Sequence, residues 1–226
     1  MADRSEARIA RRKRRSVLLV ALCALVVIAL AVGAYFIFRS HSKTVAQVNG
    51  TTITQQDLNR KLAFPLSQTP GIFSANGGAA NQKEVNQRNL DAAINQQLLL
   101  QEAKKRGIKI SGGVVNAAYS ALTKSYGTAS ELQDKLKQAN MTEAQLKSAV
   151  TDNLTIATLT RTLVPDASAT EARLKNYYNS HKSRYAGAGS FESLKTEIKA
   201  DYLNDTRSSE VNKLVVQLKK SADIKK

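Results

Sequence analysis

The sequence contains only one cysteine, Cys23, so no disulfide bond can form within the chain. A cysteine cluster that could bind a metal ion is excluded for the same reason. Cys23 lies inside an apolar run, so no catalytic thiol is available outside that run. Cysteine usage therefore gives no indication of the redox compartment, and the location of the protein must be inferred from its N-terminal segment.

Histidine is almost as scarce, with only His41 and His181 in the chain. General acid–base catalysis would need a partner within hydrogen-bond reach of either ring, and the sequence places none nearby. The chain also has no phosphate-binding loop of the GxxxxGK type, no GxSxG and no HExxH. We therefore expect no catalytic residue, no metal site and no cofactor, and the sequence disfavours an enzyme.

Acidic residues are few relative to basic ones: 18 Asp and Glu stand against 34 Lys and Arg, which gives a net charge of +16. Residues 1–43 carry +7 of this charge, and residues 44–226 carry +9. This balance leaves an anionic cell-envelope polymer open as a partner. It does not indicate nucleic acid, because lysines scattered along helical faces usually form a solvated surface.

Val17 to Phe38 is a run of 22 residues without a charged side chain. As a helix it would be about 33 Å long, enough to cross a hydrocarbon core of about 30 Å. A cleaved signal peptide is the alternative, with small residues at 32–34, but the apolar run exceeds the ~7–15 residues of a signal-peptide core. A lipoprotein site at Cys23 is disfavoured because the large Leu22 precedes it. We predict a retained transmembrane signal anchor that contacts the lipid bilayer through residues 17–38.

The charges that flank this run predict its orientation. Arg8 to Arg15 contains most of the basic residues, whereas only Arg39 and Lys43 follow the run closely. By the positive-inside rule, residues 1–16 form a cytoplasmic basic tail. We therefore expect a single-pass protein of the cell membrane whose residues 44–226 form an extracytoplasmic domain.

The segment after residue 43 is predicted to be mostly α-helical with a small β element. Asn49-Gly50 lies between two β-prone runs, a typical hairpin signal, and residues 222–226 are short enough for a terminal strand. Three sequences have the spacing of a helix-starting capping box: Thr128-x-x-Glu131, Thr142-x-x-Gln145 and Ser168-x-x-Glu171. Residues 64–82 hold two of the three prolines and are predicted to form a long irregular loop.

Several stretches, in this order, resemble the N-terminal domain of the SurA/PrsA family of extracytoplasmic chaperones and foldases. They are VAQVNGTTITQQDL (45–58), LDAAINQQLLLQEAKKRGIKIS (90–111), YGTASELQDKLKQANMTEAQLKSAV (126–150), ATEARLKNYYNSHKSRY (169–185) and SFESLKTEIKADYL with ADIKK (190–203 and 222–226). Gly112-Gly113 depart from the polar residues that the family places there. The resemblance implies a helical chaperone domain in which the C-terminal strand folds back on the N-terminal hairpin.

Many relatives carry a parvulin-type prolyl isomerase module between the last two of these stretches. Here only the small residues at 186–190 occupy that place, and the histidine pair of such a module is absent. The resemblance therefore implies a binding protein that lacks the isomerase module.

We expect a membrane-anchored chaperone-like protein that binds unfolded or newly exported polypeptides without catalysis. The candidate peptide-binding residues are apolar or aromatic side chains that a loop or a helix could expose: Phe64, Ile72, Phe73, Tyr119 and Tyr126. For the two tyrosines a core position is the competing interpretation, since an apolar helical stripe normally faces a core. Two other functions stay open: a family member with residual prolyl isomerase activity, and an envelope scaffold or adaptor without chaperone activity.

Overall fold

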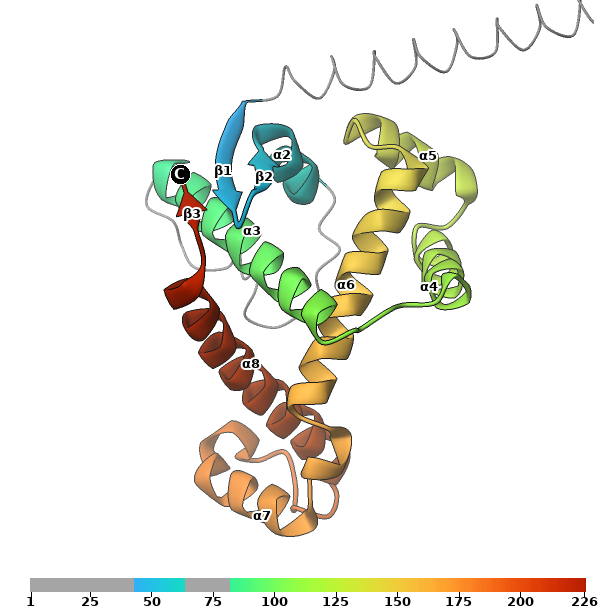
Figure 1. Ribbon diagram of the computed structural model, residues 1–226. Coiled ribbons are helices and arrows are strands. Elements are labelled where there is room, and N and C mark those ends of the chain that lie inside the picture. The colour runs from blue at the N-terminus through green and yellow to red at the C-terminus, as the bar shows by residue number, and fades with distance from the viewer. Residues whose placement is uncertain (1–42, 64–81) are drawn as a thin grey trace, which may run out of the picture. The chain divides into compact units, whose positions relative to one another are not determined.

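The structure of the protein is a computed structural model that describes residues 43–63 and 82–226, and residues 44–226 form one unit with its own core (Figure 1). Its elements, in chain order, are β1 (Thr44–Val48), β2 (Thr51–Thr54), α2 (Gln55–Ala63), α3 (Gln82–Lys105), α4 (Gly112–Ser125), α5 (Ala129–Gln138), α6 (Glu143–Leu163), the 3₁₀ turn η1 (Asp166–Ser168), α7 (Glu171–Ser180), the 3₁₀ turn η2 (Lys182–Tyr185), α8 (Lys195–Ser221) and β3 (Ile224–Lys225). The predicted fold class of a mostly helical domain with a small β element is confirmed.

Within residues 43–63 and 82–226, no helix has the length and the apolar composition needed to cross a membrane. The predicted anchor, Val17 to Phe38, lies outside these residues and stays a prediction. Three of the candidate peptide-binding residues, Phe64, Ile72 and Phe73, also lie outside them.

The sheet joins the two ends of the described chain in the order β2-β1-β3, with both pairings antiparallel. Asn49 and Gly50 form the predicted tight turn, with φ of 48° and 79°. Asn49 also ties the turn to the rest of the fold: its Nδ2 donates to Gln101 of α3 at 2.7 Å, and its Oδ1 accepts from the backbone N–H of Asp223 at 2.9 Å. The return of the C-terminal strand to the hairpin is therefore confirmed.

Two hydrophobic clusters form the centre of the unit around α3. One lies between α3 and the sheet, and the other lies where α3 meets α6 and α8 (Figure 1). The cluster under the sheet consists of Ala46, Val48, Ile53, Leu58, Ala93, Ile94 and Leu98. The three-helix cluster consists of Leu99, Ala103, Ile156, Leu159, Val211, Leu214 and Val215. The buried side chains of α3 thus hold the β element and the long helices together.

Two of the three predicted capping boxes are confirmed. The Thr128 and Thr142 side chains accept hydrogen bonds from the backbone N–H groups of Glu131 and Gln145, whose own side chains bond back to the cap residues. The third prediction is wrong. Ser168 ends the 3₁₀ turn that follows Pro165, and α7 begins after Thr170, two residues later. The Ser168 Oγ atom is buried and makes no hydrogen bond, so it does not cap α7.

We expect Thr142→Ala to lower the free energy of unfolding by about 0.5–2 kcal/mol, because it removes the acceptor that satisfies a free N–H at the start of α6. Thr170→Ala is the matched control, since Thr170 is also an N-cap residue but its side chain makes no capping hydrogen bond. Urea denaturation followed by circular dichroism measures both. Equal losses for the two variants would show that the capping bond does not stabilise α6.

Candidate polypeptide-binding surfaces

Helix α4 begins as the sequence requires, in spite of its two glycines. The Ser111 hydroxyl accepts a hydrogen bond from the backbone N–H of Val114, and Gly112 and Gly113 form the first turn. Gly127, with φ of 96°, follows the helix and allows the chain to turn toward α5. The departure from the family pattern at Gly112-Gly113 therefore does not shift the start of this helix.

One side of α4 packs against α5 and the N-terminal half of α6 (Figure 1). We call this three-helix cluster the α4–α6 lobe. Its buried residues are Leu132, Leu136, Leu146 and Val150. All four come from α5 and α6, and α4 contributes only half-buried side chains, among them Val115, Ala118 and Leu122. The lobe therefore has a core of its own, separate from the clusters around α3.

The structure brings Tyr119 and Tyr126 together in this lobe, where both are half-buried. The Tyr119 ring lies on α6, with the Lys147 Nζ atom 4.7 Å from the ring centroid. Burial raises the pKa of the Tyr119 phenol, and the nearby Glu143 carboxylate acts in the same direction. Both tyrosines thus help to close the lobe, and a direct contact with a bound polypeptide stays a prediction.

The outer side of α4 is apolar as well. Val114, Ala117 and Ala121 lie three and four residues apart on one exposed face, with the exposed Lys124 one turn farther along it, and Val114 is 49% exposed. We call Val114, Ala117 and Ala121 the outer face of α4. No residue of α4 is buried, although the helix is apolar over most of its circumference. Sequence reasoning considered large aromatic side chains and missed this face. The apolar residues of α4 cover a wider part of the helix than packing against one neighbour requires, and this width was the available signal.

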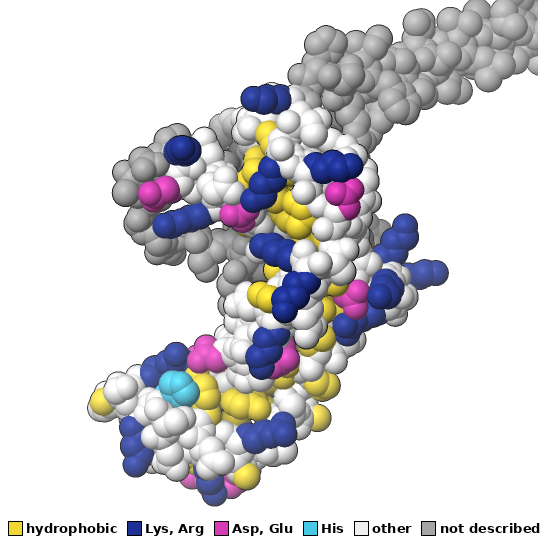
Figure 2. Space-filling view, turned by 60° about the vertical axis from the view of Figure 1, so that its left-hand side comes forward, with side chains coloured by type: hydrophobic (Ala, Val, Ile, Leu, Met, Phe, Trp, Pro, Cys, Tyr) yellow, Lys and Arg dark blue, Asp and Glu magenta, His cyan; other side chains and the backbone are white. Residues whose placement is uncertain are grey.

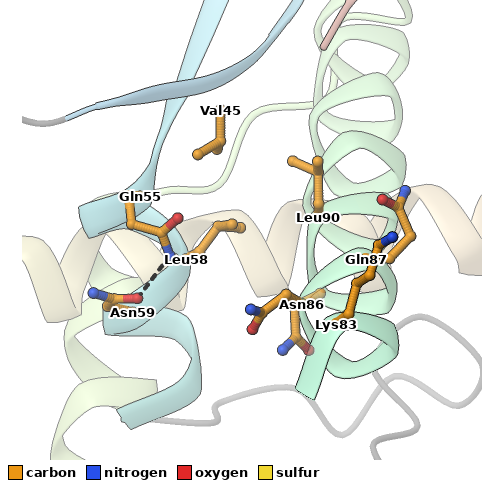
Figure 3. A pocket seen from close by; sticks show the side chains of 9 residues that line it. Val45, Gln55, Leu58, Asn59, Lys83, Asn86, Gln87 and Leu90 are labelled. Atoms are coloured by element: carbon orange, nitrogen blue, oxygen red, sulfur yellow. Dashed lines mark hydrogen bonds between the residues drawn. The ribbon is translucent and has the colours of Figure 1, made fainter. Parts of the chain in front are cut away.

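A second surface is a groove between α2 and the first turns of α3, below the start of β1 (Figure 3). Its volume is about 430 Å³. Val45, Leu58 and Leu90 supply its apolar part. Val45 lies at an irregularity in the pairing of β1 with β2, between Thr44 and Ala46. Such a bulge redirects a side chain, and here Val45 lines the groove.

The remaining lining residues are polar: Gln55, Asn59, Lys83, Asn86, Gln87 and Asn89. Gln55 donates to Asn59 at 3.0 Å along α2. Farther along the same helix, the Lys61 ammonium group donates to the buried Gln96 of α3. The second bond joins α2 to α3 outside the groove. Gln55 and Asn59 come from one wall, and Asn86 and Gln87 come from the other (Figure 3). Sequence reasoning did not find this groove, because its residues come from three separate elements.

The place expected to lack an isomerase module is a packed junction between α7 and α8. The Tyr178 ring contacts the rings of Tyr185 and Phe191, with centroids 5.5 and 5.8 Å away, and Tyr177 packs edge-on against Tyr202 at 5.7 Å. Residues 186–190 make the connection in a turn, with Gly187 and Gly189 at positive φ. Aromatic packing therefore closes the chain across this short connection.

Polar contacts reinforce the junction. The Tyr185 hydroxyl donates to Asp201 at 2.7 Å, while the Tyr177 hydroxyl donates to Asp205 and accepts from Arg184. Burial, followed by the bond to Asp201, raises the pKa of Tyr185 to about 12. His181 stacks on the Tyr177 ring at 4.2 Å, so the one described histidine serves in packing. Within residues 43–63 and 82–226, no group of His, Cys, Asp and Glu side chains could hold a metal ion.

The basic charge does not gather in one place on the face shown in Figure 2. Lysine and arginine side chains are spread over it, with acidic and hydrophobic side chains between them. Many lysines and arginines of the described residues form ion pairs, among them Lys226 with Asp91 and Arg207 with Asp166. This face gives no specific support for an anionic polymer as the partner.

The comparisons with known proteins identify a family for most of the chain. A sequence model described as the SurA-like N-terminal domain matches residues 8–160, which is more than half of the chain. The foldase protein PrsA of Clostridium acetobutylicum is 24% identical over 155 residues, which cover 64% of this chain and 46% of that protein. The chain thus matches less than half of the foldase's length. The protein belongs to the family of SurA-like N-terminal domains.

Proposed function

We propose that this protein is a chaperone-like protein that binds unfolded or newly exported polypeptides outside the cytoplasm, without catalysing a reaction on them. Membership of the SurA-like N-terminal domain family and similarity to part of a foldase support a role in protein folding. The observation that carries the proposal is the outer face of α4, an apolar helix face that no described element covers. Apolar surface exposed to water can bury the apolar side chains of a client, and this burial is favourable.

The shape and chemistry of this face suit clients of many sequences. Val114, Ala117 and Ala121 are small or medium-sized, so they offer a shallow apolar surface. Such a surface can bury a client's exposed apolar side chain without selecting one shape. The favourable free energy comes from the apolar area removed from water, at about 25 cal/mol per Å². Binding of this kind needs neither nucleotide nor cofactor.

Two features of the sequence complete the proposal. The uncharged run Val17 to Phe38, with the basic tail of residues 1–16 before it, would hold the protein in the cell membrane with residues 44–226 outside the cytoplasm. The connection at 186–190 leaves no room in the sequence for an isomerase module of the kind that relatives carry there.

The proposed topology predicts the result of a protease experiment. A protease added to spheroplasts should digest residues 44–226 and leave the anchor, and protection of that domain would contradict the topology.

The test of the proposed function places charge on the outer face of α4. In an aggregation-suppression assay with a denatured client, we expect Ala117→Glu combined with Ala121→Glu to raise the amount of protein needed by about ten-fold, which corresponds to about 1.4 kcal/mol of binding. The matched control is Asn116→Glu combined with Ser120→Glu, which adds the same charges with the same spacing on the adjacent polar face of α4. Equal activity of the two variants would rule out this face as the client site.

A further inference from the structure

The groove between α2 and α3 has the size and position of a ligand site separate from the outer face of α4. Its volume of about 430 Å³ lies within the ~300–1,000 Å³ typical of binding pockets. All of its lining residues belong to β1, α2 and α3, and none belongs to the α4–α6 lobe. The two surfaces can therefore be altered independently.

The polar lining of the groove matches a polypeptide backbone. It contains five carboxamide side chains, from Gln55, Asn59, Asn86, Gln87 and Asn89. Each carboxamide has both donors and an acceptor, the same groups that a peptide bond presents. Gln55 donates to Asn59, and Gln87 donates to Asp91. Within residues 43–63 and 82–226 the Gln55 Oε1 acceptor and the Asn59 Nδ2 donor are left for a ligand.

The groove has one charged lining residue, and it is basic. Lys83 is exposed at the start of α3 and is the one charged residue among the lining residues. In the described part of the chain no carboxylate forms an ion pair with Lys83, and residues 64–81, which precede it, contain no acidic residue. An acidic side chain on a ligand would therefore meet an available cation.

The apolar part of the groove lies about two helical turns farther along α3 than this charge. Figure 3 shows Leu58 and Leu90 projecting toward each other from the two walls, with Val45 above them and Lys83 on the same helix as Leu90. A ligand that fits has a carboxylate near an aliphatic side chain, on a backbone that is free to bond with carboxamides. An extended polypeptide segment has these groups within a few residues, since its rise is about 3.3 Å per residue.

We infer that the α2–α3 groove binds an extended polypeptide segment in which an acidic residue and an aliphatic residue are two positions apart, because alternate side chains of an extended segment point to the same side. The inference rests on the proposed function, because it identifies a class of client segment. The carboxylate pairs with Lys83, the aliphatic side chain packs between Leu58 and Leu90, and a client carbonyl group accepts a hydrogen bond from the Asn59 carboxamide. The outer face of α4 would bind apolar segments generally, whereas the groove would select among client sequences.

The test uses the full chain in detergent micelles and two fluorescently labelled peptides, Ser-Asp-Ser-Leu-Ser and the same sequence with Asn in place of Asp. Fluorescence anisotropy should show that the Asp peptide binds several-fold more tightly than the Asn peptide. Lys83→Gln should abolish this preference. Lys105→Gln, which removes an exposed cation at the other end of the same helix, should leave the preference intact. Leu90→Asn should weaken the binding of both peptides. Thermal unfolding confirms that this variant is folded.

Equal affinity for the two peptides, or the same loss of preference from Lys105→Gln as from Lys83→Gln, would overturn the inference. If the wild-type chain still suppresses aggregation in that case, the proposed function stands and only the groove assignment is lost. If the peptides bind with the expected preference but aggregation is not suppressed, the groove assignment stands as a peptide site and the general chaperone function fails.

Discussion

Replacing Leu159 by alanine should lower the free energy of unfolding of the unit formed by residues 44–226 by about 2–5 kcal/mol. The Leu159 side chain is 0% exposed and lies in the three-helix cluster where α3, α6 and α8 meet. These helices carry the sheet at one end and the α7 junction at the other, so a cavity here weakens the contacts on which both depend. Urea denaturation followed by circular dichroism should show one transition with a lowered midpoint.

Leu163→Ala is the matched control for this effect. Leu163 lies one turn farther along α6, at the margin of the same cluster, and is only half-buried. Its truncation removes the same atoms but leaves a space that solvent can fill, so we expect a clearly smaller loss. A loss for Leu159→Ala no greater than that for Leu163→Ala would contradict the central role of the three-helix cluster.

Replacing Leu146 by alanine should lower the free energy of unfolding as much as Leu159→Ala does, but only for one part of the unit. Leu146 is 0% exposed and belongs only to the core of the α4–α6 lobe. Removing its side chain should lower the free energy of opening of this lobe by about 2–5 kcal/mol, and amide exchange in α4 and α5 should become faster by on the order of 30-fold or more. Hydrogen exchange measured by mass spectrometry resolves the two helices from α3 and α8.

The same substitution at Leu159 is the comparison for Leu146→Ala. We expect Leu159→Ala to accelerate exchange in α3, α6 and α8 together, whereas Leu146→Ala should leave the amides of α3 and α8 protected. A uniform loss of protection in the Leu146 variant would mean that the lobe and the helices around α3 unfold as one unit. The lobe would then not be an independent core.

Features specified by a few neighbouring residues could be predicted from the sequence. Asn49-Gly50 adopts the left-handed conformations that the hairpin needs, and Thr128 and Thr142 cap their helices, because each signal acts within a few residues. Ser168 has the same spacing but fails as a cap. There Pro165 starts a competing 3₁₀ turn, so the local signal is lost to another local structure.

The pairing of β3 with β1 could be anticipated only from resemblance to a family. Ile224 and Val48 are far apart in the chain, and no property of a two-residue strand indicates its partner. The groove could not be predicted at all. Val45 reaches it through a bulge, and Leu58 and Leu90 meet there because α2 and α3 both pack under the sheet. Surfaces that combine separate elements depend on packing, which a linear pattern does not encode.

The sequence pointed to the helix that carries the candidate surface, but not to the surface itself. The sequence indicated α4 through Tyr119 and Tyr126, and the structure places both tyrosines in one lobe. It did not indicate that their helix has a second apolar side, because Ala117 and Ala121 are ordinary residues for any helix. Ala117 and Ala121 become candidates for binding because no described element covers them. The proposed client surface is therefore a property of the fold as much as of the residues.

The most direct measurement of the central claim is hydrogen exchange of the full chain in lipid nanodiscs, with and without a permanently unfolded polypeptide such as reduced, carboxymethylated α-lactalbumin. If the outer face of α4 binds clients, amides of residues 112–125 should gain protection when the polypeptide is added. Those of α7 and the start of α8, whose side chains are already packed at the aromatic junction, should not change. Unchanged exchange in α4 at saturating polypeptide, or protection confined to α7 and α8, would contradict the proposal.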